Sequence, residues 1–334
     1  MNHSPREGNL RKRAPSCKLP LLFLLLLVFV HLRSGHLFAA SEEPKQATIS
    51  VTTDLVVLPV NVTDSTGAFV PGLQKQHFRV YEDGALQKPS LFAEEDTPVT
   101  VGLLLDHSRS MGLKLPGVRA AVSTFAHSSN PQDEMFVIDF SDHVLIESLG
   151  VKAFTSDVTI LEKALLGISA RGQTALYDAV AEGLKHLQLG ARDKKALVIV
   201  SDGGDNASRL KYSDVLLLAR RSHVLIYSIV LAGNSEEEEN PRTLERLCNE
   251  TGGIAFFPHE SQSISDIAKT IARDLREQYT LGYAPGKRSN GNSFRKIVVR
   301  VNAPHQSHLH VRTRTGYIAP TGKASALQSM GDRQ

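Results

Sequence analysis

Continuous apolar runs alternate with helix-like patterns between about Thr97 and Gln278. The runs are typical of strands buried on both faces of a sheet: VTVGLLL (99–105), MFVIDF (135–140), VLIESL (144–149), ALVIVS (196–201), VLIYSIVL (224–231) and IAFFP (254–258). Between them, apolar residues recur with helical spacing in 118–125, 176–187 and 264–275. This order predicts an α/β fold, with a doubly wound, mainly parallel, Rossmann-like sheet and helices on both faces. VLIESL comes so soon after MFVIDF that we expect it to form an antiparallel edge strand.

Strand-like patterns flank this domain on both sides, in residues 47–95 and 279–319. The first flank contains TISVTTDLVVLPVNVTD and a hairpin signal at Asp83-Gly84, and the second contains YTLGYAP, FRKIVVRVN and HLHVRTRTGYIA. Each flank is too small to bury a good core alone. We therefore expect the two flanks to pair in one β-sandwich, with the α/β domain at 97–278 inserted between them.

The second flank also shows alternation, which predicts one solvent-exposed face. The residues on that face would be Val298, Arg300, Asn302, His310, Arg312 and Arg314. Residues 320–334 are small and polar, and we expect a disordered tail.

Residues 1–40 have the pattern of a secretory signal peptide. A basic stretch, RKRAPSCK, precedes the apolar run LPLLFLLLLVFV, and Ala39 and Ala40 follow it. The alternative is an uncleaved anchor, although the run is short for a membrane span. We expect an exported protein, located in the periplasm, at the cell surface or in the medium. After cleavage Cys248 would be the one remaining cysteine; it lies in a helical pattern, LERLCNETGG, and is expected to be buried.

The basic charge of the chain comes from this leader. The formal net charge is +3, and residues 1–40 contain six Lys or Arg and one Glu. The remainder has 32 basic and 34 acidic residues. The composition therefore excludes a global basic field of the kind that binds nucleic acid.

Oxygen-bearing side chains follow the predicted strands at one edge of the sheet. In DHSRSMG, Asp106, Ser108 and Ser110 come directly after the first strand, Asp202 follows ALVIVS, and Thr174 precedes a helix in RGQTALYDAV. Because the carboxyl ends of parallel strands meet at one edge, these five side chains should converge. Hard oxygen donors of this kind are the ligands that Mg²⁺ prefers.

Each of these residues also has an ordinary structural interpretation. Asp106 and Ser110 could cap the following helix, and Asp202-Gly203 could form a common turn. The occurrence of all five in order favours the metal site. Of the neighbours, we expect Asp205 at the rim, Asp178 on a helix face, and His107 pointing away from the ligands.

The segment 97–278 closely resembles a von Willebrand factor type A domain. The metal-ion-dependent adhesion site of that family reads D-x-S-x-S, then a Thr, then an Asp, and Asp106, Ser108, Ser110, Thr174 and Asp202 match it in full. The resemblance implies a bound Mg²⁺, or another divalent cation such as Mn²⁺. It also implies that the serines, and often the threonine, touch the metal directly, whereas the aspartates act mainly through water. The flanks resemble a secreted bacterial subgroup best known from Acidobacteria, in phrases such as VTDSTGAFVPGL and YTLGYAP.

This chemistry predicts a binding module. Neutral hydroxyls leave the charge of the cation poorly compensated, and an acidic side chain of a partner protein can complete its six-oxygen shell. We expect no catalytic residues, and we expect specificity to lie in loops 142–156 and 203–212.

Two alternatives remain open. One is a structural envelope protein whose metal only braces the loops. The other is a Mg²⁺-dependent hydrolase, which is disfavoured because Ser108 stands where a haloacid-dehalogenase-type phosphatase needs a second Asp.

Overall fold

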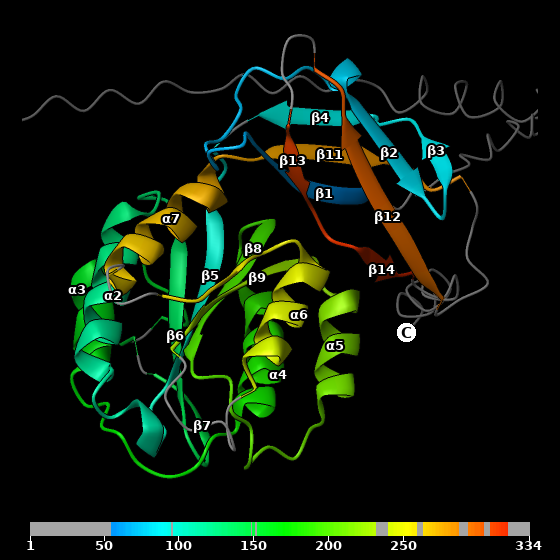
Figure 1. The fold of residues 1–334 in the computed structure, drawn as a ribbon. Coiled ribbons are helices and arrows are strands. Elements are labelled where there is room, and N and C mark those ends of the chain that lie inside the picture. Colours follow the sequence, from blue (N-terminus) through cyan, green and yellow to red (C-terminus); the bar gives the residue numbers. More distant parts are fainter. Residues whose placement is uncertain are drawn as a thin grey trace, which may run out of the picture. The chain divides into compact units, whose positions relative to one another are not determined.

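The computed structural model describes residues 55–94, 96–147, 149–150, 152–231, 240–258, 263–286, 293–303 and 308–319. They form an α/β domain and a pair of antiparallel sheets (Figure 1). The predicted leader at 1–40 and the predicted tail at 320–334 lie outside the described residues. Within the described ranges, no helix is both long and apolar enough to cross a membrane.

A six-stranded sheet forms the centre of the α/β domain, in the order β10-β9-β8-β5-β6-β7. Its strands are β5 (Val99–Asp106), β6 (Glu134–Phe140), β7 (Val144–Ile146), β8 (Lys194–Ser201), β9 (Val224–Val230) and β10 (Ala255–Phe256). Every residue of β5 and β9 is buried, because helices cover both faces of the sheet. All neighbours pair in parallel except β6 and β7. The predicted doubly wound sheet and its antiparallel edge strand are therefore confirmed.

Two groups of helices cover this sheet, with α2, α3 and α7 packed together in one and α4, α5 and α6 in the other (Figure 1). The helices are α2 (Leu115–Ser128), α3 (Val158–Leu165), α4 (Leu176–His186), α5 (Tyr212–Arg221), α6 (Pro241–Thr251) and α7 (Ile264–Arg276), with short 3-10 turns η1 (Lys75–His77), η2 (Arg109–Met111) and η3 (Leu187–Leu189). Three of them match the predicted apolar stripes, and Cys248 is buried in α6 as expected. The hydrophobic pattern did not predict α3 and α5, because each buries only two of its residues.

The two flanks of the chain share two four-stranded antiparallel sheets. Their orders are β13-β1-β11-β4 and β14-β12-β2-β3, so each sheet takes strands from both flanks. The strands are β1 (Val56–Thr63), β2 (Phe78–Glu82), β3 (Ala85–Gln87), β4 (Leu91–Glu94), β11 (Tyr279–Tyr283), β12 (Phe294–Val301), β13 (His310–Arg312) and β14 (Gly316–Ile318). One apolar cluster joins the sheets, and the rings of Phe78 and Tyr279 lie 5.1 Å apart within it. At the predicted hairpin, Asp83 and Gly84 have φ of 48° and 82°, as a tight two-residue turn requires.

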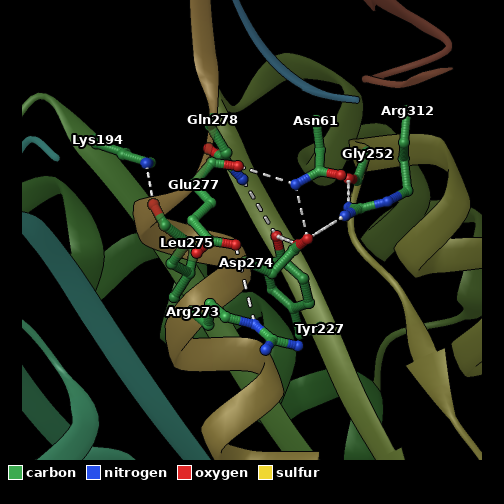
Figure 2. A network of polar contacts seen from close by, with 10 residues as sticks. All are labelled: Asn61, Lys194, Tyr227, Gly252, Arg273, Asp274, Leu275, Glu277, Gln278 and Arg312. Atoms are coloured by element: carbon green, nitrogen blue, oxygen red, sulfur yellow. Dashed lines mark hydrogen bonds and ion pairs between the residues drawn. The ribbon is translucent and has the colours of Figure 1, made fainter. Parts of the chain in front are cut away.

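The prediction of a solvent-exposed face is wrong for Arg312 and Arg314. Val298, Arg300, Asn302 and His310 are exposed as expected, but Arg314 is only 5% exposed. The guanidinium of Arg312 donates to both carboxylate oxygens of Asp274, at 2.7 and 2.6 Å, and to the carbonyl of Gly252 (Figure 2). The face is covered because the α/β domain packs on it, which alternation along one strand cannot reveal.

The carboxylate of Asp274, in α7, is the centre of this contact between the sandwich and the α/β domain. Besides Arg312, it accepts hydrogen bonds from the amide of Asn61 at 2.8 Å and from the hydroxyl of Tyr227 at 2.6 Å (Figure 2). These partners come from β1, β9 and β13, so one side chain joins three strands of two sheets.

Arg314 forms a second contact of this kind. Its guanidinium donates to the carbonyls of Gly316 and Arg220, at 2.8 and 2.9 Å, and lies 3.0 Å from Nδ1 of His223. Since an arginine can only donate, Nδ1 of His223 must be the acceptor and the ring is neutral. Burial, together with the charge of Arg314, lowers the pKa of His223.

We expect the free energy of unfolding to fall as the pH drops below about 6.5, the ordinary pKa of histidine. The unfolded chain then takes up a proton at His223 that the folded chain, with its lowered pKa, does not. Urea unfolding at pH 7.5 and pH 5 should show a larger loss for the wild type than for His223→Gln, which keeps an acceptor but does not titrate. Equal losses in the two proteins would contradict this account.

Candidate metal-binding site

All five predicted ligands lie at the carboxyl edge of the central sheet. Asp106 is the last residue of β5 and Asp202 directly follows β8, the strand that pairs in parallel with β5. Ser108 and Ser110 lie at the η2 turn, and Thr174 comes two residues before α4. The parallel topology therefore brings together segments that are far apart in the sequence.

Three of the side chains are in direct contact. The hydroxyl oxygens of Ser108 and Ser110 lie 3.1 Å apart, and Ser110 donates to Oδ2 of Asp202 at 2.5 Å. Oδ1 of Asp106 accepts from the backbone N–H of Ser108 at 2.8 Å. Ser110 is exposed, whereas the other three are buried, so the cluster opens to solvent on the Ser110 side.

Thr174 is held next to the Asp202 loop through its backbone. Its N–H donates to Oδ1 of Asn206 at 2.8 Å, and its carbonyl accepts from the N–H groups of Asn206 and Ala207, both at 3.0 Å. Among the described residues, no hydrogen bond joins its hydroxyl to the other four ligands.

The two carboxylates of the cluster are buried without a counter-charge. Asp106 is 0% exposed and Asp202 is 3% exposed, and no ion pair among the described residues involves either of them. Burial raises the pKa of Asp106 to about 6, while hydrogen bonds from Ser201 and Ser108 act in the opposite direction. Because buried carboxylates are costly unless they are paired, a cation bound here would relieve that cost.

The donor set fits a hard divalent cation. It consists of two carboxylates and three hydroxyls, the oxygen ligands that suit Mg²⁺ or Mn²⁺. Within the described ranges, no group of three or more His, Cys, Asp or Glu side chains could hold a metal. A site at this edge of the sheet therefore depends on the serine and threonine oxygens.

Two residues that support the cluster were not predicted from the sequence. Ser201, the last residue of β8, donates to Oδ2 of Asp106 at 2.6 Å and accepts from the N–H of Gly203 at 3.1 Å. Asn206 bonds to Thr174, as described above. Ser201 is the polar residue that ends an apolar run, a sequence signal that could have been used, but its partner is 95 residues away.

The neighbouring acids and the histidine of the motif hold the surrounding segments. Nδ1 of His107 lies 2.9 Å from a carboxylate oxygen of Asp139 in β6, and both side chains are buried. Asp205 accepts from the N–H of Tyr177 at 3.1 Å. Asp178 accepts from the N–H groups of Arg209 and Leu210 at 3.1 and 3.0 Å. The two acids thus join the loop after Asp202 to the first turn of α4.

The family model of the von Willebrand factor type A domain matches residues 101–270. A von Willebrand factor type A protein from Catenulispora acidiphila is similar in structure, with 12% identity, a TM-score of 0.47, and coverage of 80% of this chain and 63% of its own. An aerotolerance-related membrane protein from Bacteroides fragilis has 16% identity and a TM-score of 0.44, over 53% of this chain and 98% of its own. The minor pilin PilB from Streptococcus sanguinis has 13% identity and a TM-score of 0.42, over 55% and 63%. The family match covers half of the sequence, and the chain therefore belongs to the von Willebrand factor type A domain family.

Proposed function

We propose that this chain binds a divalent cation, Mg²⁺ or Mn²⁺, at Asp106, Ser108, Ser110, Thr174 and Asp202, and that it thereby binds an acidic group of a partner protein. The observation that carries the proposal is the pair of buried carboxylates, which face hydroxyl groups and have no basic partner among the described residues. Domains of this family are generally interaction modules, which agrees with a binding role.

The bound cation would supply a positive centre for an oxygen of a partner's Asp or Glu. Asp106 and Asp202 balance part of its charge from the buried side of the cluster. Ser110 lies on the exposed side, where a partner can approach. The hydrogen bond from the N–H of Ser108 to Asp106 holds the loop in place before any ligand arrives.

The structure favours binding over the bracing alternative, because protein hydrogen bonds already hold the loops of the site. Asn206 joins Thr174 to the Asp202 loop, and the N–H of Arg171 donates to the carbonyl of His107 at 2.8 Å. A cation would therefore add little to their order. A Mg²⁺-dependent hydrolase would need a side chain that helps to activate water. The histidine nearest to the cluster in sequence, His107, is instead buried against Asp139.

We further propose that binding takes place after export, in the periplasm, at the cell surface or in the medium. This rests on the predicted signal peptide in residues 1–40.

Calorimetric titration of the chelator-treated chain with MgCl₂ or MnCl₂ tests the cation site. The wild type should bind one ion, and Ser110→Ala should lower the affinity at least about tenfold, because it removes an exposed donor with little effect on the core. The control is Ser128→Ala in α2, whose hydroxyl donates to the carbonyl of Thr124. Absence of binding heat with both metals would contradict the proposal.

Binding of a multivalent peptide tests whether the group that the cation binds is a carboxylate. Short Gly/Ser peptides carrying one Asp, displayed on streptavidin, should bind the chain in Mg²⁺ and not in EDTA. A rise in melting temperature with Mg²⁺, without any peptide binding, would instead support the bracing alternative.

A further inference from the structure

We propose that the docking segment of the partner carries several acidic residues and a large apolar side chain beside the acid that the cation binds. This inference rests on the proposed function and names the partner's chemistry. It is drawn from four exposed residues in the two segments that adjoin the cluster, Arg109 and Leu113 in one and Leu166 and Arg171 in the other, which we call the docking rim.

The two arginines come from backbone segments that pair with each other beside the cluster. The N–H of Arg171 donates to the carbonyl of His107 at 2.8 Å, and the N–H of Arg109 donates to the carbonyl of Gly172 at 3.3 Å. Arg109 stands between the two predicted serine ligands in sequence. The rim is therefore continuous with the candidate metal site.

Neither arginine side chain has an acidic or hydrogen-bonding partner among the described residues. The acid of the adjoining loop, Asp142, accepts from the N–H of Gln173 at 2.9 Å. Gly172 has φ of 73°, and a side chain there would collide with the carboxylate of Asp142. The loop that carries Arg171 is therefore tied to the Asp142 loop, while the guanidinium of Arg171 makes no hydrogen bond or ion pair among the described residues.

The two leucines are the apolar part of the rim. Leu113 is 99% exposed and lies two residues after the η2 turn, and Leu166 is 75% exposed at the end of α3. Residues near them are close to each other, because a Cβ added at Gly112 would lie 3.5 Å from the Cβ of Ala170. Arg119, in the helix that follows Leu113, also donates to the carbonyl of Ile168. Contiguous apolar patches with a polar rim mark protein-binding surfaces, and in this proposal the two side chains contribute to one such patch.

Charge and hydrophobicity together select the class of partner. A guanidinium pairs with carboxylates in a bidentate manner, so acids flanking the metal-bound one would gain contacts with Arg109 and Arg171. An apolar residue of the same segment would cover Leu113 and Leu166, as apolar anchors do at the centre of interfaces. A purely acidic or purely apolar segment would use only half of the rim.

Three peptide probes test this inference, all short Gly/Ser sequences displayed on streptavidin. One carries a single Asp, the second three Asp, and the third three Asp and one Leu. In Mg²⁺, affinity for the wild type should rise in that order. The double variant Arg109→Gln/Arg171→Gln should lose about tenfold in affinity for the three-Asp probe and much of its salt dependence. Leu113→Ser/Leu166→Ser should remove the advantage of the Leu-containing probe.

Matched exposed residues away from the site serve as controls. Arg273→Gln in α7, where the side chain is 63% exposed, and Leu189→Ser at η3, 68% exposed, should bind all three probes like the wild type. If the single-Asp probe binds in a Mg²⁺-dependent manner but the rim variants equal the wild type, the inference fails while the proposed function stands. If acidic probes bind equally in EDTA and lose affinity only in the arginine variant, the rim is supported and the cation-based function fails. If no probe binds, both fail.

Discussion

Replacing Asp106 with asparagine is expected to lower the affinity for Mg²⁺ about 100-fold, and to abolish Mg²⁺-dependent peptide binding with it. Asparagine has nearly the same shape, and its carbonyl oxygen can still accept a hydrogen bond from Ser201 or Ser108. What disappears is one of the two buried negative charges that face the hydroxyls. Calorimetric titration with MgCl₂ and capture of the single-Asp probe measure the two effects.

The comparison with Ser201→Ala separates charge from structure. That variant removes the hydrogen bond to Asp106 but keeps the carboxylate, so it should bind Mg²⁺ within a few-fold of the wild type. Asp106→Ala should also lose Mg²⁺ binding. In addition, its free energy of unfolding should fall by about 1–3 kcal/mol for each buried donor left without an acceptor, the N–H of Ser108 and the hydroxyl of Ser201. Mg²⁺ affinity unchanged in Asp106→Asn, with peptide binding that persists after chelation, would show the metal hypothesis to be wrong.

Asp274→Ala is expected to lower the free energy of unfolding by about 3 kcal/mol. The substitution leaves the guanidinium of Arg312 without its carboxylate, in a position where only 22% of the arginine side chain is exposed. It also removes the acceptor of the Tyr227 hydroxyl and one of the two acceptors of the Asn61 amide, which keeps the carbonyl of Glu277 (Figure 2). Because these groups join the sandwich to the α/β domain, the two parts should also unfold less cooperatively.

Urea unfolding followed by circular dichroism at two wavelengths measures both effects. In the wild type the two transitions should coincide, and in Asp274→Ala they should separate. The control is Asp96→Ala, which removes a more exposed ion pair with Arg276 at 2.8 Å and should cost no more than about 1 kcal/mol. A loss in Asp274→Ala no larger than in this control would mean that the contact contributes little to stability.

Much of the α/β domain could be predicted from the sequence. Strands such as β5 and β9 are buried on both faces, so they appear as unbroken apolar runs whatever surrounds them. The rule that parallel strands end at one edge then placed Asp106 and Asp202 together. The short helices α3 and α5 escaped prediction because two buried positions do not make a periodic pattern.

The candidate site, too, has parts that could be predicted from the sequence and parts that could not. Its proposed ligands follow strands and could be located by their order, whereas Ser201 and Asn206 act through partners that no local pattern specifies. Cation binding itself stays a prediction until it is measured.

The sequence by itself determined where the strands of the central sheet and the helices with a periodic apolar stripe form, because hydrophobic periodicity is a local property of the chain. The alternation of those strands and helices then indicated a parallel sheet, with the oxygen donors at one edge. Only the tertiary structure decided that Arg312 and Arg314 lie in a contact between two parts of the chain and not in solvent. In isolation their strand alternates like an exposed one, but packing of the α/β domain buries Arg314 and pairs Arg312 with Asp274. Burial depends on which surfaces meet, and that depends on contacts between residues far apart in the chain.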